Sequence, residues 1–313
     1  MELTVNTVNF STKKFSWNTT LTLSHNKNSV KALTGEAVQL YEAKFGFNQN
    51  THRIAVGEPL GQFYGYITEG LYQVDDFNYD ASTQTYTLKD GVPYHGDKGQ
   101  IRPGMWKFKN LTGDDNVIDE NDKTVIGNAQ PKFYGGLNNS FTYKGFDLSI
   151  FLTFSYGNEV LNATKLVTSK VGSLNYNALD VMNSSNRWMT INSDGQKVTD
   201  PGELAALNAG KTVAAYHDAQ QGDNYIHSWA VEDASYLKLS NVTLGYTFPK
   251  NLIARVGLKN LRLYATGNNL LTWTKYSGFD PEVSTMKSGL TPGVDFGAYP
   301  LSRSFIFGLN VAF

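Results

Sequence analysis

The stretch 132–156, KFYGGLNNSFTYKGFDLSIFLTFSY, contains two alternating runs joined by a very short turn. In each run the apolar side chains recur at every second position, which is the period of a β-strand. Lys144-Gly145 is the turn, so the runs 133–143 and 146–156 are predicted to pair as an antiparallel hairpin. Only Phe151 breaks the pattern, because it places an aromatic ring on the otherwise polar side.

Two environments could hold this hairpin. A soluble sandwich would bury the apolar side against a second sheet, whereas an outer-membrane barrel would turn that side to lipid and the polar side to a wet interior. Long strands, a polar side of Ser, Thr, Asn and Gly, and aromatic residues near the strand ends favour the barrel. The hairpin alone leaves both environments open.

The composition excludes several classes of protein. The 313 residues carry a net charge of −1 without a block of like charge, which argues against a nucleic-acid partner. The chain has no cysteine, so disulfide scaffolds, Cys-ligated zinc and thiol chemistry are excluded. No run of about 18 apolar residues occurs, so a membrane-spanning helix is not predicted.

Other segments repeat the alternation and are predicted to be strands. They are residues 3–10, 15–24, 236–248, 261–273 and 304–313. Long polar connections are expected at about 26–131, 157–235 and 274–299, and short turns at 11–14, at 144–145 and after Pro249.

Short and long connections alternate strictly along the chain. If the strands run up and down, every short turn lies at one end and every long loop at the other, as in outer-membrane barrels with short periplasmic turns and long extracellular loops. A Greek-key sandwich has no reason to follow this rule. The predicted fold class is therefore all-β, as part of a large antiparallel transmembrane β-barrel.

Seven strands cannot close such a barrel. Bacterial barrels have an even number of strands, roughly eight or more, and unpaired strand edges in lipid leave backbone groups without hydrogen bonds. Residues 1–313 are therefore expected to be the C-terminal segment of a larger barrel. The chain also starts without a signal peptide, which an outer-membrane protein requires, so its front is expected to be missing.

Several motifs resemble SusC/RagA-type TonB-dependent outer-membrane transporters in their order and spacing. They are IGNAQPKFYGGL at 126–137, YKGFDL at 143–148, YGN at 156–158, EDASYLKLSNVTLGY at 232–246, GNNLLTWTKYSGFDPE at 267–282, YPLSR at 299–303 and the terminal Phe313. Lys238 stands where that family usually has arginine.

The resemblance implies the last seven strands of a barrel of about 22 strands with an N-terminal plug. It implies import of oligosaccharides or peptides across the bacterial outer membrane, with a SusD-type surface lipoprotein as partner. Energy would come from the TonB complex through the missing N-terminal region, and the lipid bilayer would surround the wall. No enzyme activity is expected. The alternative is a soluble, secreted β-rich module that binds glycans.

One loop has some features of a metal site. Residues 110–122 resemble a calcium loop, but Asn110 and Thr112 replace acidic ligands, and Asp115 stands where glycine should permit the turn. Calcium near Asn110–Asp122 is therefore an alternative to an acidic, solvated turn, and no other cofactor is expected. Histidines without metal spacing are interpreted as surface or loop residues; they are His25, His52, His95, His217 and His227.

Aromatic residues in the long connections are the candidates for substrate binding. Sugars are held by aromatic faces and by fixed polar groups around them, which singles out Trp188, Arg187, Trp229, Trp273, Tyr276 and Asp280. The alternative is that these side chains pack the loops together. The carboxylates of Glu232-Asp233 and Asp119-Glu120 are interpreted as solvated loop charges rather than as the acid pair of a glycan hydrolase.

Overall fold

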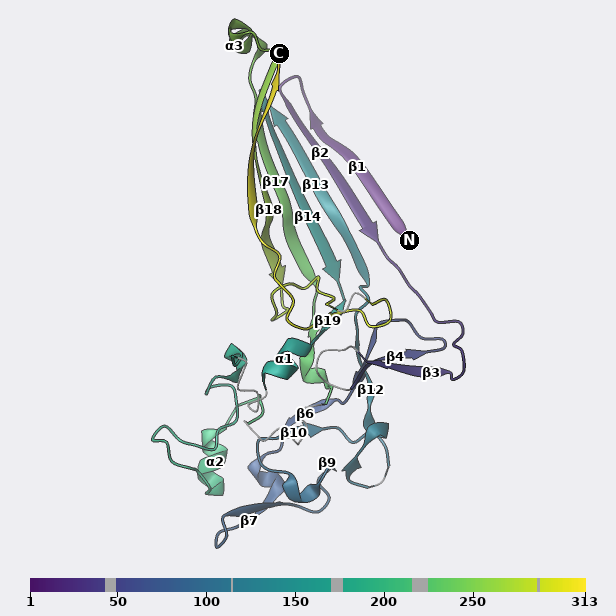
Figure 1. Cartoon of the computed structure of the whole chain (residues 1–313), viewed down its shortest axis with the longest axis vertical. Helices are drawn as coiled ribbons and strands as arrows, with labels where there is room; N and C mark the ends of the chain where they lie inside the picture. The colour runs from purple at the N-terminus through teal and green to yellow at the C-terminus, as the bar shows by residue number, and fades with distance from the viewer. Residues whose placement is uncertain (43–48, 114, 170–176, 216–224, 286–287) are drawn as a thin grey trace.

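A computed structural model gives the structure of residues 1–42, 49–113, 115–169, 177–215, 225–285 and 288–313 (Figure 1). Seven long strands form one sheet, and the connections at one end of that sheet fold into a second region. Within the described residues, no helix is both long enough and apolar enough to cross a membrane.

The large sheet contains the seven predicted strands, and each neighbouring pair is antiparallel. Its order is β1 (Glu2–Ser11), β2 (Phe15–Ser24), β13 (Phe133–Tyr143), β14 (Phe146–Tyr156), β17 (Tyr236–Thr247), β18 (Asn260–Thr274) and β20 (Ser304–Ala312). The all-β prediction of an antiparallel up-and-down sheet is confirmed. The sheet is open, with β1 and β20 at its two edges.

The strand register gathers the apolar side chains on one side of the sheet, here called the apolar face. One row runs from Leu21 through Leu137, Leu152 and Leu239 to Leu271, each paired with the next across a strand boundary. The opposite side, the polar face, carries mainly Ser, Thr, Asn and Gly. β-Bulges in β17 and β18 shift the pairing without mixing the two sets of side chains.

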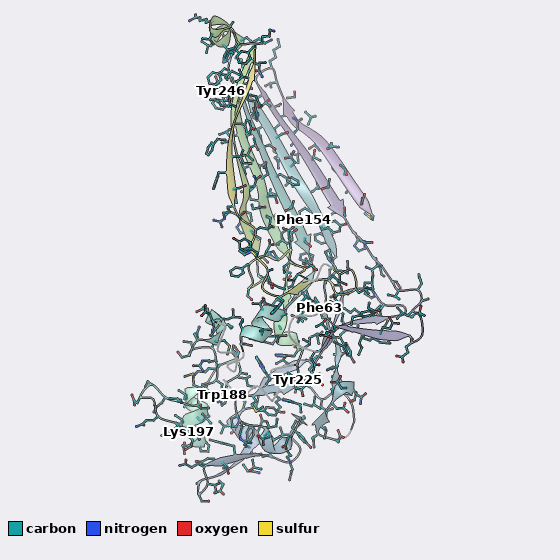
Figure 2. The ribbon with its side chains drawn as sticks, in the orientation of Figure 1. Phe63, Phe154, Trp188, Lys197, Tyr225 and Tyr246 are labelled. Atoms are coloured by element: carbon teal, nitrogen blue, oxygen red, sulfur yellow. The ribbon has the colours of Figure 1, made fainter. Side chains whose placement is uncertain are left out.

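The apolar face is uncovered. Phe307 is 81% exposed and Leu244 is 50% exposed. The clusters of buried hydrophobic side chains formed by the described residues contain no residue of this face. Phe154 and Tyr246 lie near its opposite ends (Figure 2), as expected of aromatic residues at two membrane interfaces. Among the described residues, no second sheet covers this face as it would in a sandwich.

Short connections lie at one end of the sheet and long ones at the other (Figure 1). The short end holds the turns β1–β2 and β13–β14, together with α3 (Lys250–Ile253) and the 3-10 turn η6 (Ala254–Val256) between β17 and β18. The connection between β17 and β18 is longer than the short turn predicted after Pro249, because it contains these helical turns. The alternation seen in the sequence thus sorts the connections to two ends of the sheet.

The long connections fold together into what we call the loop region. The first connection comprises residues 25–132, the second 157–235 and the third 275–303. The first contains β3 (Val38–Glu42), β4 (Asn50–Ala55), β5 (Gln62–Gly65), β6 (Thr68–Leu71), η1 (Val74–Asp76), β7 (Phe77–Asp80), β8 (Thr85–Leu88), β9 (Tyr94–His95), η2 (Lys98–Gln100), β10 (Trp106–Phe108), β11 (Val117–Ile118), η3 (Glu120–Asp122) and β12 (Thr124–Asn128). The second and third contain β15 (Glu159–Asn162), α1 (Ala163–Thr168), η4 (Asp180–Met182), α2 (Pro201–Leu207), η5 (Ser228–Ala230), β16 (Val231–Asp233) and β19 (Val294–Asp295).

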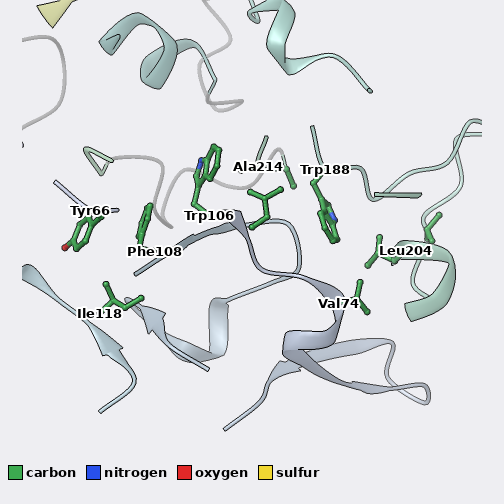
Figure 3. Close-up of a cluster of buried hydrophobic side chains, with 11 residues drawn as sticks. Tyr66, Val74, Trp106, Phe108, Ile118, Trp188, Leu204 and Ala214 are labelled. Atoms are coloured by element: carbon green, nitrogen blue, oxygen red, sulfur yellow. The ribbon is translucent and has the colours of Figure 1, made fainter. Parts of the chain in front are cut away.

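Contacts between distant connections hold the loop region together. β15 pairs with β16 in antiparallel fashion and with β19 in parallel, which joins the second connection to the third. A buried cluster combines Trp106 and Phe108 of the first connection with Trp188 and Leu204 of the second (Figure 3). Burial of these apolar side chains stabilises the packing of the long connections against one another, although their sequences are mostly polar.

Gly65 provides a test of this packing. A Cβ atom at Gly65 would lie 2.2 Å from the carbonyl oxygen of Ile226, which also accepts a hydrogen bond from the Tyr66 amide. Because the obstructing atom is backbone, Gly65→Ala is expected to destabilise the loop region by about 1–3 kcal/mol, the usual cost of overpacking. Thermal unfolding followed by tryptophan fluorescence measures this loss. Gly289→Ala, where nothing lies within 4 Å of the added atom, is the control, and equal melting of both variants would contradict the assignment.

Candidate functional site

A cleft of about 380 Å³ lies where the polar face meets the loop region, and we call it the junction cleft. The sheet contributes Tyr134, Ser155 and Tyr236, which are direct neighbours in register across β13, β14 and β17. The three long connections supply the rest of the lining, including Pro131, Glu159, Pro281 and Glu282. The junction cleft therefore combines aromatic and apolar surface with a few hydrogen-bonding groups, as small-molecule sites do.

Lys238 fastens the third connection to the polar face beside this cleft. Its side chain is only 4% exposed, and its Nζ forms an ion pair with Glu282 and lies 3.7 Å from Asp280 Oδ1. The Tyr236 hydroxyl donates to Glu282 Oε1 at 2.5 Å. We call these four residues the Lys238 clamp. One cation faces two carboxylates, so the clamp leaves negative charge at the cleft wall.

A second anchor joins the second and third connections. Glu232 accepts hydrogen bonds at 2.8 Å from both the amide and the hydroxyl of Ser277, and it lies 3.0 Å from Lys165 Nζ. Burial alone would raise the pKa of Glu232, but these hydrogen bonds and the ammonium group hold it below its usual value. The prediction of a solvated charge is wrong for Glu232, whose side chain is 12% exposed.

Tyr276, a predicted binding residue, is buried and fixes the third connection from within. Its hydroxyl donates to Asp295 Oδ2 at 2.5 Å, and burial followed by this carboxylate raises the pKa of the phenol. Asp280, another predicted residue, belongs to the Lys238 clamp and borders the junction cleft through its neighbours Pro281 and Glu282.

The other predicted binding residues lie elsewhere. Trp188 is 1% exposed in the buried cluster of Figure 3, and Trp229 packs against that cluster with Lys165 Nζ 4.1 Å from its ring centroid. Arg187 is partly buried, and its backbone forms an isolated parallel β-bridge with that of Val213. Trp273 is exposed on the apolar face, where it pairs with Leu237. The six residues thus do not converge on one surface, and a substrate-binding role for each stays a prediction.

Sequence reasoning missed the lining of the junction cleft and the cation beside it. Tyr134 and Tyr236 belong to strands, whereas the predicted ligand-binding aromatic residues lie in or next to the long connections. A signal was present, because Lys238 is the only charged residue in β17 and stands on its polar side. Its carboxylate partners are 42 and 44 residues away in the sequence, a distance that periodicity does not bridge.

The predicted calcium loop is organised by one buried carboxylate. Asp122 is fully buried, and its oxygens accept from the Leu111 and Thr112 amides at 2.6 and 2.9 Å and from the Asp119 amide at 2.8 Å. Burial alone would raise the pKa of Asp122, but these hydrogen bonds hold it below its usual value. Asp122 is therefore not the solvated charge that the sequence predicts. Residue 114 of this loop lies outside the described residues.

Metal binding at residues 110–122 stays a prediction. In the described ranges, no group of three or more His, Asp or Glu side chains is arranged to hold a metal ion. The hydrogen bonds to Asp122 close the loop with protein groups alone.

Asp122→Asn tests how this loop is held. The amide group would turn a donor toward backbone amides, so the variant is expected to lose about 1–3 kcal/mol of unfolding free energy. Thermal melting with and without EGTA measures the loss and also shows whether calcium adds stability to the unsubstituted protein. The exposed Asp194→Asn is the control, and a melting temperature unchanged by Asp122→Asn would contradict this account.

Three of the histidines interpreted as surface or loop residues are buried. His52 Nε2 donates to the Pro292 carbonyl at 2.9 Å, and Nδ1 of the same ring lies 2.8 Å from the Thr51 hydroxyl. Burial lowers the pKa of His52 to about 4. Among the described residues, neither ring nitrogen of His95 has a hydrogen-bond partner, and burial lowers the pKa of His95 to about 4. Burial, with Lys165 and His95 nearby, lowers the pKa of His227 to about 3. These three rings are therefore neutral at pH 7, and His227 Nδ1 lies within hydrogen-bond distance of the Thr68 hydroxyl. His217 lies outside the described residues.

Comparison with known proteins supports the fold and its family. No family model matches the chain. The chain is 33% identical over its full length to TonB-dependent receptor P3 of Formosa agariphila and 27% identical to TonB-dependent receptor SusC of Bacteroides thetaiotaomicron. It covers 28% and 26% of those proteins, so it spans just over a quarter of the length of the relatives it matches.

Solved structures agree at the level of the fold. The RagAB peptide transporter matches the whole chain with a TM-score of 0.66 and 19% sequence identity, and the chain covers 29% of that protein. The relatives are named as TonB-dependent receptors and as a peptide transporter. The paired strands, the uncovered apolar face and the full-length sequence similarity together place the chain in the family of TonB-dependent receptors that includes SusC.

Proposed function

We propose that this chain forms part of the wall and the extracellular loops of a bacterial outer-membrane transporter that imports nutrients. The uncovered apolar face is the observation that carries the proposal. Rows of Phe and Leu on this face, such as Phe305 at 68% and Phe307 at 81% exposed, are suited to contact with lipid. The polar face would then line the interior, and the loop region would face the outside of the cell.

The alternative, a soluble glycan-binding module, has no specific observation in its favour. A soluble protein rarely exposes a contiguous apolar surface of this extent. The unpaired edges of β1 and β20 would also invite further strand pairing in water.

The proposed substrates are oligosaccharides or peptides, with energy supplied by the TonB complex and a SusD-type lipoprotein as partner. Support for these finer points comes from the family and from the junction cleft, which lies between the polar face and the loop region. A solute that enters through the loops would meet Tyr134, Tyr236 and Glu282 before reaching the rest of the polar face.

Membrane fractionation tests the first part of the proposal. The protein in its native cells is expected in the outer-membrane fraction and to migrate faster in gels before heating than after it, as folded barrels do. Recovery in the soluble fraction would contradict the proposal. Growth of a deletion strain on single oligosaccharides and on single peptides, together with co-purification of a lipoprotein, tests the substrate and the partner.

A further inference from the structure

The short-turn end of the sheet carries a band of positive charge (Figure 1). The connections at this end contain six exposed cationic side chains, which are Lys13, Lys14, Lys144, Lys250, Arg255 and Lys259. We call this set the basic rim. None of the six forms an ion pair with a residue that the structure describes.

Backbone hydrogen bonds join the short connections into one continuous edge. The Lys144 amide donates to the Lys14 carbonyl at 3.3 Å, which links the β13–β14 turn to the β1–β2 turn. The Thr247 amide donates to the Gly145 carbonyl at 2.8 Å, which links the β13–β14 turn to the end of β17. The cations of the basic rim are therefore neighbours along one edge of the wall, although they come from segments far apart in the sequence.

The basic rim has almost no negative charge beside it. In residues 10–17, 141–148 and 245–262, the only acidic side chain is that of Asp147. Its Oδ2 lies 2.5 Å from Arg262 Nη2, and its Oδ1 accepts from Arg262 Nε at 3.0 Å, so this carboxylate is already neutralised. The basic rim thus keeps its positive charge, whereas carboxylates outnumber the cation in the Lys238 clamp at the other end of the sheet.

A layer of aromatic rings lies next to the basic rim on the apolar face. Its members are Phe10, Phe15, Tyr143, Phe146, Tyr246 and Phe248. The ring centroids of Phe146 and Tyr246 are 4.5 Å apart. Lys144 Nζ lies 5.2 Å from the centroid of the Tyr143 ring, which places this cation beside the face that is expected to contact lipid.

The connection between β17 and β18 adds apolar surface to the basic rim. Leu252 is 53% exposed and Val256 is 71% exposed, and they lie one helical turn apart, next in sequence to rim residues. Ile253 is buried and anchors the same segment. Exposed apolar side chains interleaved with cations are typical of segments that lie in the headgroup layer of a bilayer.

We propose that the basic rim binds anionic phospholipids of the periplasmic leaflet. The ammonium and guanidinium groups contact the lipid phosphates, while the aromatic layer and the apolar face continue along the glycerol and acyl parts of the lipid. A zwitterionic lipid offers the same phosphate but carries its own cation, so lipids with net negative charge are preferred. This inference goes beyond transport, and it rests on the membrane position that the proposed function requires.

Photo-crosslinking in the full-length protein tests the inference. A benzoylphenylalanine in place of Leu252 is the local reporter, and the protein is reconstituted into vesicles of phosphatidylcholine with a minor share of phosphatidylglycerol. Mass spectrometry of the adducts gives the share of phosphatidylglycerol among the captured lipids. Heat-modifiable migration in gels checks that each variant is folded.

Phosphatidylglycerol is expected to be enriched about fivefold over its share in the vesicles, the factor that one Lys or Arg near an anionic surface contributes. Combining Lys250→Gln, Arg255→Gln and Lys259→Gln should bring the captured share to within about twofold of the share in the vesicles. Added salt should act in the same direction, because it screens exposed charges.

A variant that combines Lys31→Gln, Lys109→Gln and Lys197→Gln is the matched control. It loses the same charge from exposed positions of the loop region, and it is expected to keep the enrichment. An equal loss of enrichment in both triple variants would mean that the lipids respond to net charge alone, and the inference would be overturned.

Soluble glycerol phosphate, added at the concentration of the anionic lipid, separates a lipid site from a site for free phosphate. The enrichment is expected to stay unchanged, because the soluble compound lacks the acyl chains that lie along the apolar face. Loss of the enrichment would assign the basic rim to a free phosphate and would overturn the inference.

The remaining outcomes separate the inference from the proposed function. Lipid adducts without enrichment of phosphatidylglycerol would overturn the inference alone, since the protein would still lie in the membrane. Irradiation of outer-membrane fractions that gives protein adducts in place of lipid adducts would assign the basic rim to an acidic protein partner and would also overturn it. Recovery of the full-length protein only outside the membrane would overturn the proposed function and the inference together.

Discussion

Lowering the pH from 7 to 4 is expected to loosen the loop region while the seven-stranded sheet stays paired. His52 and His95 have pKa values of about 4 in the folded protein, against 6.5 for an ordinary histidine. His227 has a pKa of about 3. The folded state therefore binds fewer protons than the unfolded state between these values.

The sign of the effect follows from this difference. Above pH 6.5 the three rings are neutral in both states, and folding stability does not depend on them. As the pH falls from 6.5 toward 4, only the unfolded state gains protons. Each of these histidines therefore lowers the free energy of unfolding by about 3 kcal/mol over this pH range. Glu232, whose pKa is lowered from 4.5, adds a loss of stability only below that pH.

His95→Leu isolates one contribution. Within the part of the chain that the structure describes, neither ring nitrogen of His95 has a hydrogen-bond partner, and the centre of the ring lies 5.0 Å from that of Phe108. An apolar side chain is therefore expected to be tolerated at pH 7. The variant should shift the acid transition of the loop region to lower pH. Fluorescence of Trp106, Trp188 and Trp229 follows this transition, because these residues lie in or against its buried cluster.

The exposed His25→Leu is the control for this experiment. An acid transition that occurs at the same pH in His95→Leu and in the unsubstituted protein would show that His95 does not limit acid stability.

Replacement of Lys238 by methionine is expected to release the third connection from the polar face. The change leaves Asp280 and Glu282 facing each other without a cation in a mostly buried setting. Breaking a buried pair in this way costs about 3 kcal/mol, at the lower end of the usual range because the Glu282 side chain is 38% exposed. Lys238→Arg keeps the charge and is expected to hold the connection in place.

Trypsin cleavage after the exposed Lys275 measures the release. Cleavage in outer-membrane fractions should be several-fold faster in Lys238→Met than in Lys238→Arg or the unsubstituted protein. Loss of Lys238 should also change the shape of the junction cleft, because Glu282 belongs to the Lys238 clamp and also lines the cleft. Equal cleavage rates in all three proteins would mean that other contacts, such as Ser277 with Glu232, hold the connection alone.

The wall could be read from the sequence because its information is local. Leu148, Ile150 and Leu152 alternate with Ser149, Phe151 and Thr153, and this period fixes both the strand and the two faces it presents. The alternation of short and long connections then set the up-and-down order. Even the irregular Phe151 was visible, although its support by Gly136 was not.

The loop region and the junction cleft were decided only by the tertiary structure. Trp188 looked like a ligand-binding residue in an exposed loop, but it is buried against side chains that lie about a hundred residues earlier in the chain. Lys238 gains its two carboxylates, and His95 its apolar surroundings, from segments that are remote in sequence. The alternation of side chains shows which residues form a strand and on which face of the sheet each side chain lies. Burial, ion pairing and the pKa of a histidine depend on which distant segments close over it, and only the folded chain supplies that information.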